Sequence, residues 1–345
     1  MSHPYRNAPD RAFWSRAVAQ GFVAGDVVDA SAPLIRNGER VISAGSCFAA
    51  NLVPYLESAG ITYLRTEARH PEFAWAPPEA MSYDKFSAAY GNMYTPRQAL
   101  QLLQRASGAF RPQEDRWVEA DRVVDPYRPG LRYPARTERE FEFLTAQHLA
   151  AVRRAFAEAD VLVFTLGLTE AWMSALDGAV FPACPGTLAG QFNADRHVFK
   201  NFTTEETTAD LIAFIEAARV LNPRLRAILT VSPVPLVATA TGAHVLAATT
   251  YSKSVLRVAA ESAKARLKDV VYFPSYEIVT GPQAPADFFE ADRRNVSRVA
   301  VDAVMAAFLA HCETSDTPAR TEEKPTPGLS AAIVDFECEE AAAEG

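Results

Sequence analysis

Short apolar runs alternate with longer amphipathic stretches along most of this chain. Continuous apolar runs at 41–45, 160–167, 226–233 and 269–276 predict strands that are covered on both faces. Patterns of helical period at 96–106, 137–158, 205–222, 249–267 and 296–311 predict helices between and after them. This order, with short connections, predicts a mostly parallel sheet with helices on both faces, an α/β fold of three layers.

Local signals set several boundaries. Thr95 followed by Pro96 is a strong helix start, and Pro223 ends the helix over 205–222. The run at 41–45 passes directly into a helical pattern over 46–58, and 60–64 predicts a second strand. Residues 116–135 suggest a small hairpin. We therefore expect one domain over 1–312, with an irregular insertion at about 65–136, and a disordered acidic tail over 313–345.

The net charge of −8 comes mostly from that tail. Residues 313–345 carry nine acidic and two basic side chains, so the remaining chain is close to neutral. A nearly neutral body offers no electrostatic footprint for nucleic acid. The tail's composition is typical of disorder and permits contact with a protein partner.

The rest of the composition suggests a soluble protein of a reducing compartment. No run of about 18 apolar residues exists that would span a membrane, and the N-terminus has no apolar core of a secretory signal. The four cysteines, at 47, 184, 312 and 338, have no metal-ligand or disulfide-framework spacing. We expect a cytoplasmic location. No histidine or carboxylate spacing suggests a metal, and no phosphate-loop glycine pattern occurs, so no cofactor is expected.

Polar side chains cluster where the predicted strands end. Parallel strands bring their carboxyl ends to one edge, where α/β proteins bind ligands. The first strand ends in Gly45, Ser46 and Cys47, and a later one in Gly167, Leu168, Thr169 and Glu170. A thiol at a helix N-terminus is a plausible nucleophile, because the helix dipole lowers its pKa and free N–H groups would hold an oxyanion. The structural alternative is a buried Cys47 packing under the helix, with Ser46 as its N-cap.

The motif around this turn resembles the GSCFA family, a branch of the SGNH/GDSL hydrolase superfamily. Similar blocks follow in order over residues 38–310, and they are AGSCFAANL, MYTPRQALQLL, FTLGLTEAW, FPACPGT, FKNFTTEETTADL, LTVSPVPLVATATGAHVL, YSKSVLR and YFPSYEIV. The resemblance implies a flavodoxin-like three-layer α/β/α sheet. It also implies an esterase or O-acyltransferase that acts on a glycan or other polyhydroxyl compound.

Residue roles follow from the resemblance position by position. Cys47 falls on the superfamily's nucleophile and Ser46 on the residue before it, and a slip of one residue reverses the two. Thr169 stands in place of the oxyanion Asn. Asp292 stands in the acid position, and Asn295 occupies the place of the base His. The further residues implied at the oxyanion or substrate site are Gly45 and Gly91 or Asn92.

The base is open among six histidines, at 3, 70, 148, 197, 244 and 311. We favour His244, which follows a strand end in a Gly/Thr-rich loop, over His197. Other polar groups have weaker claims. Glu170 could orient a base or bind a hydroxyl, and Asn201 could be a site amide. Lys253 and Arg257 share a helix face and could hold an anion, although a solvated face is the commoner reading of such a pair. Candidates for stacking on a sugar are Trp75, Tyr94 and Trp172.

Two functions are compatible with these residues. The first is an SGNH-like esterase or O-acyltransferase that forms an acyl-enzyme at the Gly45–Cys47 turn. The alternative is a catalytically degenerate binding module that recognises an acylated sugar, because Thr169 and Asn295 replace the superfamily's Asn and His.

Overall fold

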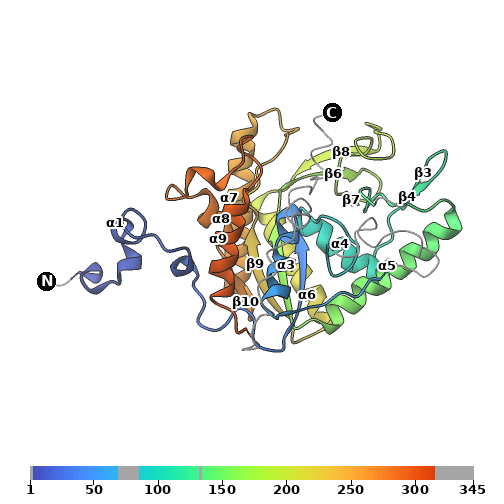
Figure 1. Cartoon of the computed structure of the whole chain (residues 1–345). Coiled ribbons are helices and arrows are strands. Elements are labelled where there is room, and N and C mark those ends of the chain that lie inside the picture. The colour runs from blue at the N-terminus through green and yellow to red at the C-terminus, as the bar shows by residue number, and fades with distance from the viewer. Residues whose placement is uncertain (1–2, 69–84, 132–133, 315–345) are drawn as a thin grey trace.

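Five parallel strands form the central sheet of this protein. The structure is a computed structural model, and Figure 1 shows the whole chain as a ribbon. The structure describes residues 3–68, 85–131 and 134–314, and of Cys47 it describes the backbone only. The central strands are β1 (Arg40–Gly45), β2 (Thr62–Tyr63), β5 (Val161–Leu166), β9 (Arg226–Val231) and β10 (Val270–Tyr272). Their spatial order is β2-β1-β5-β9-β10. In chain order this is 2-1-3-4-5, which confirms the flavodoxin-like arrangement.

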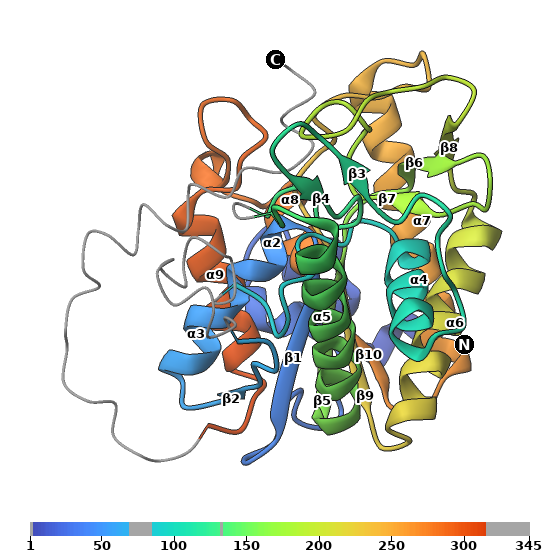
Figure 2. The same ribbon diagram turned by 90° about the vertical axis from the view of Figure 1, so that its right-hand side faces the viewer.

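Helices cover both faces of this sheet, as the apolar strands require. One face carries α4 (Pro96–Ser107), α5 (Glu138–Glu158), α6 (Thr204–Leu221) and α7 (Val245–Arg266), and the other carries α3 (Leu52–Ser58), α8 (Ser275–Thr280) and α9 (Arg298–Leu309). Side chains alternate between the two cores: Leu162 and Phe164 face the first, and Val161 and Val163 the second. Figure 2 shows α5 in front of the sheet, running roughly along the direction of β1.

The predicted helix starts are confirmed where a capping residue marks them. Thr95 Oγ1 accepts the N–H of Gln98 at 3.2 Å at the start of α4. Thr203 and Glu206 form a reciprocal capping box at the start of α6.

The helix expected over 46–58 is interrupted. The structure has α2 (Cys47–Ala50), one turn long, and then α3 from Leu52. Pro54 lies in the first turn of α3 and lacks the N–H that would bond to the carbonyl of Ala50, so the helical ladder stops there. The expected dipole of a long helix at Cys47 is correspondingly reduced.

Two smaller sheets lie outside the central one. The hairpin predicted at 116–135 is present as β3 (Trp117–Val118) paired with β4 (Val123–Val124). A three-stranded antiparallel sheet, β7-β6-β8, was not expected from the sequence. Its strands are β6 (Glu170–Ser174), β7 (Val180–Phe181) and β8 (His197–Asn201), and they follow the carboxyl end of β5.

The N-terminal segment extends away from the sheet and helices (Figure 1). It holds the short elements η1 (Pro4–Asn7), η2 (Asp10–Ala12) and α1 (Trp14–Ala17), and η3 (Ala24–Val27) then leads to the domain. A further short element, η6 (Ala286–Phe288), precedes α9. Within the described ranges, no helix combines the length and hydropathy needed to cross a bilayer. Residues 315–345, most of the predicted tail, lie outside the described residues, and the tail and domain boundaries stay predictions.

Candidate functional site at the ends of β1 and β5

The strand order reverses between β1 and β5. In a sheet of this topology the crevice for a ligand opens at such a switch point, beyond the carboxyl ends of the two strands. Gly45 ends β1 and pairs with Thr165 of β5. The segment with Ser46 and the segment from Gly167 to Glu170 therefore begin side by side, as the strand-end argument predicted.

Gly45 makes the turn possible. Its φ of 138° lies in a region that side chains disfavour, and a Cβ placed there would lie 2.3 Å from the carbonyl oxygen of Thr165. Its own carbonyl accepts the N–H of Met93 at 2.7 Å, and the next N–H, of Ser46, donates to Thr165 O at 3.2 Å. The glycine thus lets the chain leave β1 in close contact with β5.

Ser46 is buried at this turn and is 3% exposed. Its Oγ has no partner among the described residues, so Ser46 occupies the N-cap position of α2 without capping it. Gly167 packs against it, because a Cβ on Gly167 would lie 3.2 Å from Ser46 Cβ. Most buried hydroxyl groups in proteins form a hydrogen bond, so a buried hydroxyl without one needs an explanation. This makes the turn at Ser46 a candidate site.

A third segment, residues 91–95, joins these two. The carbonyl oxygen of Tyr94 accepts the N–H groups of Gly167 and Leu168, at 3.0 and 2.9 Å. Gln98 of α4 fixes the segment from behind: its Oε1 accepts the N–H of Tyr94, and its Nε2 donates to Asn92 O at 2.8 Å. No pattern in the sequence indicated this role for Gln98.

Gly91 and Asn92, expected as an oxyanion donor, lie in the same segment. Gly91 has φ of 68°, and Asn92 is buried with its Oδ1 unpaired among the described residues. Asn92 therefore shares with Ser46 a buried polar atom that the protein leaves unsatisfied.

Thr169 is built into the protein interior. Its N–H donates to Ser252 Oγ at 3.0 Å, and its hydroxyl donates to Asn201 Oδ1 at 2.7 Å. Thr169 and Asn201 are thus brought together as expected, but they bond to each other.

Lys253 lies next to this pair, on α7. It is 1% exposed, and its Nζ donates to the carbonyl oxygen of Gly167 at 2.7 Å. The expectation of a solvated helix face for Lys253 and Arg257 is therefore wrong at Lys253. Arg257 does lie partly exposed, paired with Glu261 and Glu277. Lys253 stands three residues before Leu256 and seven before Ala260, both buried, and this spacing was a signal for its burial.

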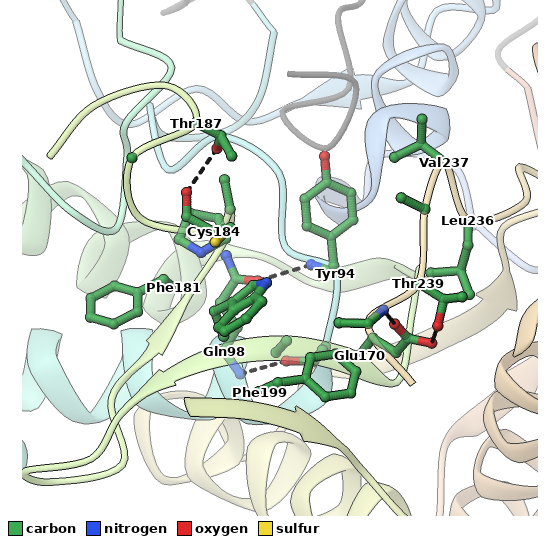
Figure 3. Close-up of a pocket in the computed structure, with 18 residues that line it drawn as sticks. Tyr94, Gln98, Glu170, Phe181, Cys184, Thr187, Phe199, Leu236, Val237 and Thr239 are labelled. Atoms are coloured by element: carbon green, nitrogen blue, oxygen red, sulfur yellow. Dashed lines mark hydrogen bonds between the residues drawn. The ribbon is translucent and has the colours of Figure 1, made fainter. Parts of the chain in front are cut away.

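A cavity of about 420 Å³ opens beside these strand ends (Figure 3). Tyr94 lines it, and the backbone of Tyr94 also contacts Gly167, which packs against Ser46; Ser46 itself is not one of the lining residues. Its walls come from the start of α4, the sheet β7-β6-β8, residues 182–187 and residues 236–240. Tyr94 and Trp172, expected as stacking residues, both line it, whereas Trp75 lies outside the described residues.

Glu170 lies in the wall of this cavity as the first residue of β6. Its Oε1 accepts the hydroxyl of Thr239 at 2.7 Å and its Oε2 accepts the N–H of Ala240 at 3.4 Å. Burial raises the pKa of Glu170 above its ordinary value, against these hydrogen bonds, which lower it. A carboxyl facing a cavity with a shifted pKa is a candidate binding group.

None of the described histidines forms a hydrogen bond with the Ser46 hydroxyl. His244 is exposed and caps α7, with Nδ1 accepting the N–H of Leu246 at 3.2 Å. His197 is buried, with Nε2 3.1 Å from Glu114, and His148 is buried, with Nδ1 2.7 Å from Glu67. His311 bonds to Gly25, and His70 lies outside the described residues. Since Ser46 Oγ has no partner, no described imidazole is within hydrogen-bonding distance of it.

Asp292 and Asn295 pair with each other in an exposed turn before α9. Asp292 Oδ2 accepts the amide of Asn295 at 2.7 Å, and Oδ1 accepts the N–H groups of Arg294 and Asn295. Burial raises the pKa of Asp292, but these hydrogen-bond donors outweigh burial and leave the pKa below its ordinary value. Asp292 and Asn295 are therefore bonded to each other, but the amide of Asn295 cannot act as a general base.

The family model of the GSCFA family matches residues 40–308, which is most of the chain. The chain belongs to the GSCFA family. None of the curated proteins compared with it matches.

The chain is also similar to solved structures, two of which are carbohydrate esterases. One is a carbohydrate esterase family 3 protein from Talaromyces cellulolyticus, 10% identical, with a TM-score of 0.38 over 78% of this chain and 93% of that one. The other is the Clostridium thermocellum family 3 carbohydrate esterase, 11% identical, with a TM-score of 0.34 over 79% of this chain and 94% of that one.

The family motif lies at the switch point of the sheet. The GSCFA segment that gives the family its name forms the turn at the switch point, and the later blocks supply the Gly167 segment, the cavity wall at 236–240 and buried Lys253. The family blocks thus converge on one edge of the sheet. Among the described residues, no three His, Cys, Asp or Glu side chains are grouped to hold a metal ion.

Proposed function

We propose that this GSCFA protein is an esterase or O-acyltransferase that acts on an ester of a glycan or other polyhydroxyl compound. The observation that carries the proposal is that the buried hydroxyl of Ser46, at the switch point and next to Cys47, has no hydrogen-bond partner among the described residues. The turn leaves β1 through a glycine that brings the next residues against β5. A nucleophile at such a place meets a substrate in the crevice.

The reaction would proceed in two steps. The oxygen of Ser46 or the sulfur of Cys47 attacks the acyl carbon and loses its proton to a base, and the alcohol leaves with a proton. Water, or a second hydroxyl compound, then attacks the acyl-enzyme and restores the nucleophile. Backbone N–H groups at the start of α2, with Asn92, are the proposed groups around the oxyanion.

His244 remains the proposed base, with Asp292 as the proposed acid. His244 follows residues 236–240, which line the cavity, and this adjacency along the chain supports the assignment. Its test is turnover itself: His244→Gln should lower kcat by about 10²-fold or more, whereas His311→Gln should leave kcat unchanged.

Turnover of p-nitrophenyl acetate tests the proposal as a whole. Replacement of the nucleophile, by Ser46→Ala or Cys47→Ala, should lower kcat/KM by about 10³-fold or more while the protein stays folded. Ser58→Ala and Cys312→Ala are the matched controls, since Ser58 is exposed on α3 and Cys312 lies against α9. Wild-type turnover in both Ser46→Ala and Cys47→Ala would contradict the proposal.

A binding module is the second candidate. It is favoured by the lack of a hydrogen bond between Ser46 Oγ and any described imidazole, and by the Asp292–Asn295 pair, which lacks a base. Such a module would be stabilised by an acylated sugar without forming product. A covalent acyl adduct on Ser46 or Cys47 after exposure to p-nitrophenyl acetate would argue against it.

A further inference from the structure

One face of the small sheet forms an aromatic wall of the cavity. Glu170 and Trp172 are two residues apart on β6, so their side chains point to the same face. Trp172 pairs in register with Phe181 of β7 and Phe199 of β8, which places three aromatic residues side by side across the sheet. The rings of Trp172 and Phe199 lie 5.7 Å apart at 62°. All four residues line the cavity.

The described charged side chains that line this cavity are acidic only. Glu170 is the only acidic residue among the described lining residues, and none of them is Lys, Arg or His. Thr239 and Ala240 hold the carboxylate in place, as Figure 3 shows for Thr239. A lone carboxylate without a basic neighbour in the lining repels an anionic ligand and attracts a cation.

Most polar side chains around the cavity are already used by the protein. Gln98 bonds through its amide to Tyr94 and Asn92, Thr187 donates to the carbonyl of Cys184 at 2.8 Å, and Thr239 donates to Glu170. The side-chain donors of Gln98, Thr187 and Thr239 are therefore already engaged within the protein. Aromatic faces and one carboxylate are instead the groups that hold an alkylated ammonium ion.

We infer that this cavity is a subsite for an organic cation, an alkylated ammonium group held between Glu170 and the rings of Trp172 and Phe199. The inference deepens the proposed function, since it adds a cationic group to the ester that reacts at the Ser46 turn. The polyhydroxyl part of such a substrate would lie outside the cavity. Binding of the cation requires no turnover, so the inference and the proposed function can fail separately.

Choline chloride and its uncharged isostere 3,3-dimethylbutan-1-ol provide the test with the full chain, by calorimetric titration at pH 8. Choline should bind about tenfold more tightly than the alcohol. Glu170→Gln, which keeps an oxygen for Thr239, should bring the two affinities together. Glu205→Gln, which removes an exposed acid at the start of α6, is the control for net charge and should change neither.

Trp172→Leu and Phe199→Leu test the aromatic part. Each substitution should lower the affinity for choline severalfold. A thermal unfolding curve of each variant without ligand shows whether the variant is folded. Equal affinity of the wild type for choline and the alcohol, no binding of either, or unchanged choline affinity in Glu170→Gln would each overturn the inference. Choline binding without ester turnover in any variant would support the cation subsite and count against the proposed function alone.

Discussion

The Nζ of Lys253 donates a 2.7 Å hydrogen bond to the carbonyl oxygen of Gly167, in the residue that packs against Ser46. One position earlier, Ser252 Oγ accepts the N–H of Thr169. Two consecutive residues of α7 therefore hold the backbone that follows β5. The position of the segment beside the candidate nucleophile depends on a helix far along the chain.

Lys253→Met should destabilise the protein. It leaves the buried carbonyl of Gly167 without its donor, and we expect the free energy of unfolding in urea to fall by about 1.5–3 kcal/mol. Lys264→Met, on the same helix but with a partly exposed side chain, should change it by less than about 0.5 kcal/mol. A Lys253→Met variant as stable as wild type would mean that desolvation of the ammonium cancels its hydrogen bond.

Gly45→Ala should be far more damaging than Gly60→Ala. Both glycines have positive φ, 138° and 74°, but a Cβ at Gly60 meets nothing within 4 Å, whereas at Gly45 it collides with Thr165. We expect Gly60→Ala to cost about 1–2 kcal/mol of unfolding free energy and Gly45→Ala more than about 4 kcal/mol. Chemical denaturation compares them, and equal costs would contradict the close approach of β1 to β5.

Ser46→Ala should leave stability unchanged or slightly higher. The Ser46 hydroxyl is buried without a partner, so its removal breaks no hydrogen bond and relieves a desolvation cost. Ser43→Ala is the matched comparison, because Ser43 Oγ lies 2.8 Å from the Tyr63 hydroxyl in the same strand environment. That variant should lose about 1–3 kcal/mol. A larger loss in Ser46→Ala than in Ser43→Ala would show that the Ser46 hydroxyl is structurally bonded.

Acid should unfold the protein partly through a buried cluster of charged groups. His148 Nδ1 lies 2.7 Å from Glu67, and Arg128 pairs with both Glu67 and Asp125. Burial, helped by Arg128, lowers the pKa of His148 against the attraction of Glu67. Burial opposes ionisation of Glu67 and Asp125, but the neighbouring cations outweigh it and lower the pKa of each.

The sign of the pH effect follows from these shifts. Below about pH 6.5 the unfolded chain protonates His148 while the folded chain resists, so stability falls with pH. The ion-paired carboxylates add a second loss as the pH falls below about 4.5, because the unfolded carboxyls protonate first. Urea unfolding from pH 8 to pH 3 measures the loss from His148 and the onset of the loss from the carboxylates. His148→Gln should flatten the change between pH 6.5 and 5 relative to wild type and keep the lower one; equal slopes in both proteins would contradict the assignment.

Local patterns were sufficient for much of the fold. The apolar run at 160–167 became β5 because a strand covered on both faces needs no polar alternation. Thr95 and Pro96 marked the start of α4, and the alternation of strands and helices predicted the parallel sheet. The interruption of the helix after Ala50 also had a local cause, in Pro54, that the amphipathic pattern concealed.

Local sequence patterns predicted only part of the candidate site. The wall of Glu170, Trp172 and Phe199 depends on strand pairing across a long connection, which no periodicity reports. The burial of Lys253 depends on which helix face meets the end of β5, and a charged residue by itself predicts the opposite.

The sequence alone determined that a glycine turn with a hydroxyl and a thiol closes the first strand, and that the chain resembles the GSCFA family. Both are properties of contiguous residues. The tertiary structure decided what lies near that turn: Gly167 against Ser46, Tyr94 against Gly167, Lys253 bonded to the segment after β5, and a cavity with one carboxylate. These neighbours are set by the strand order β2-β1-β5-β9-β10. Contacts between segments far apart in the chain follow from how sheets and helices pack, which local patterns do not record.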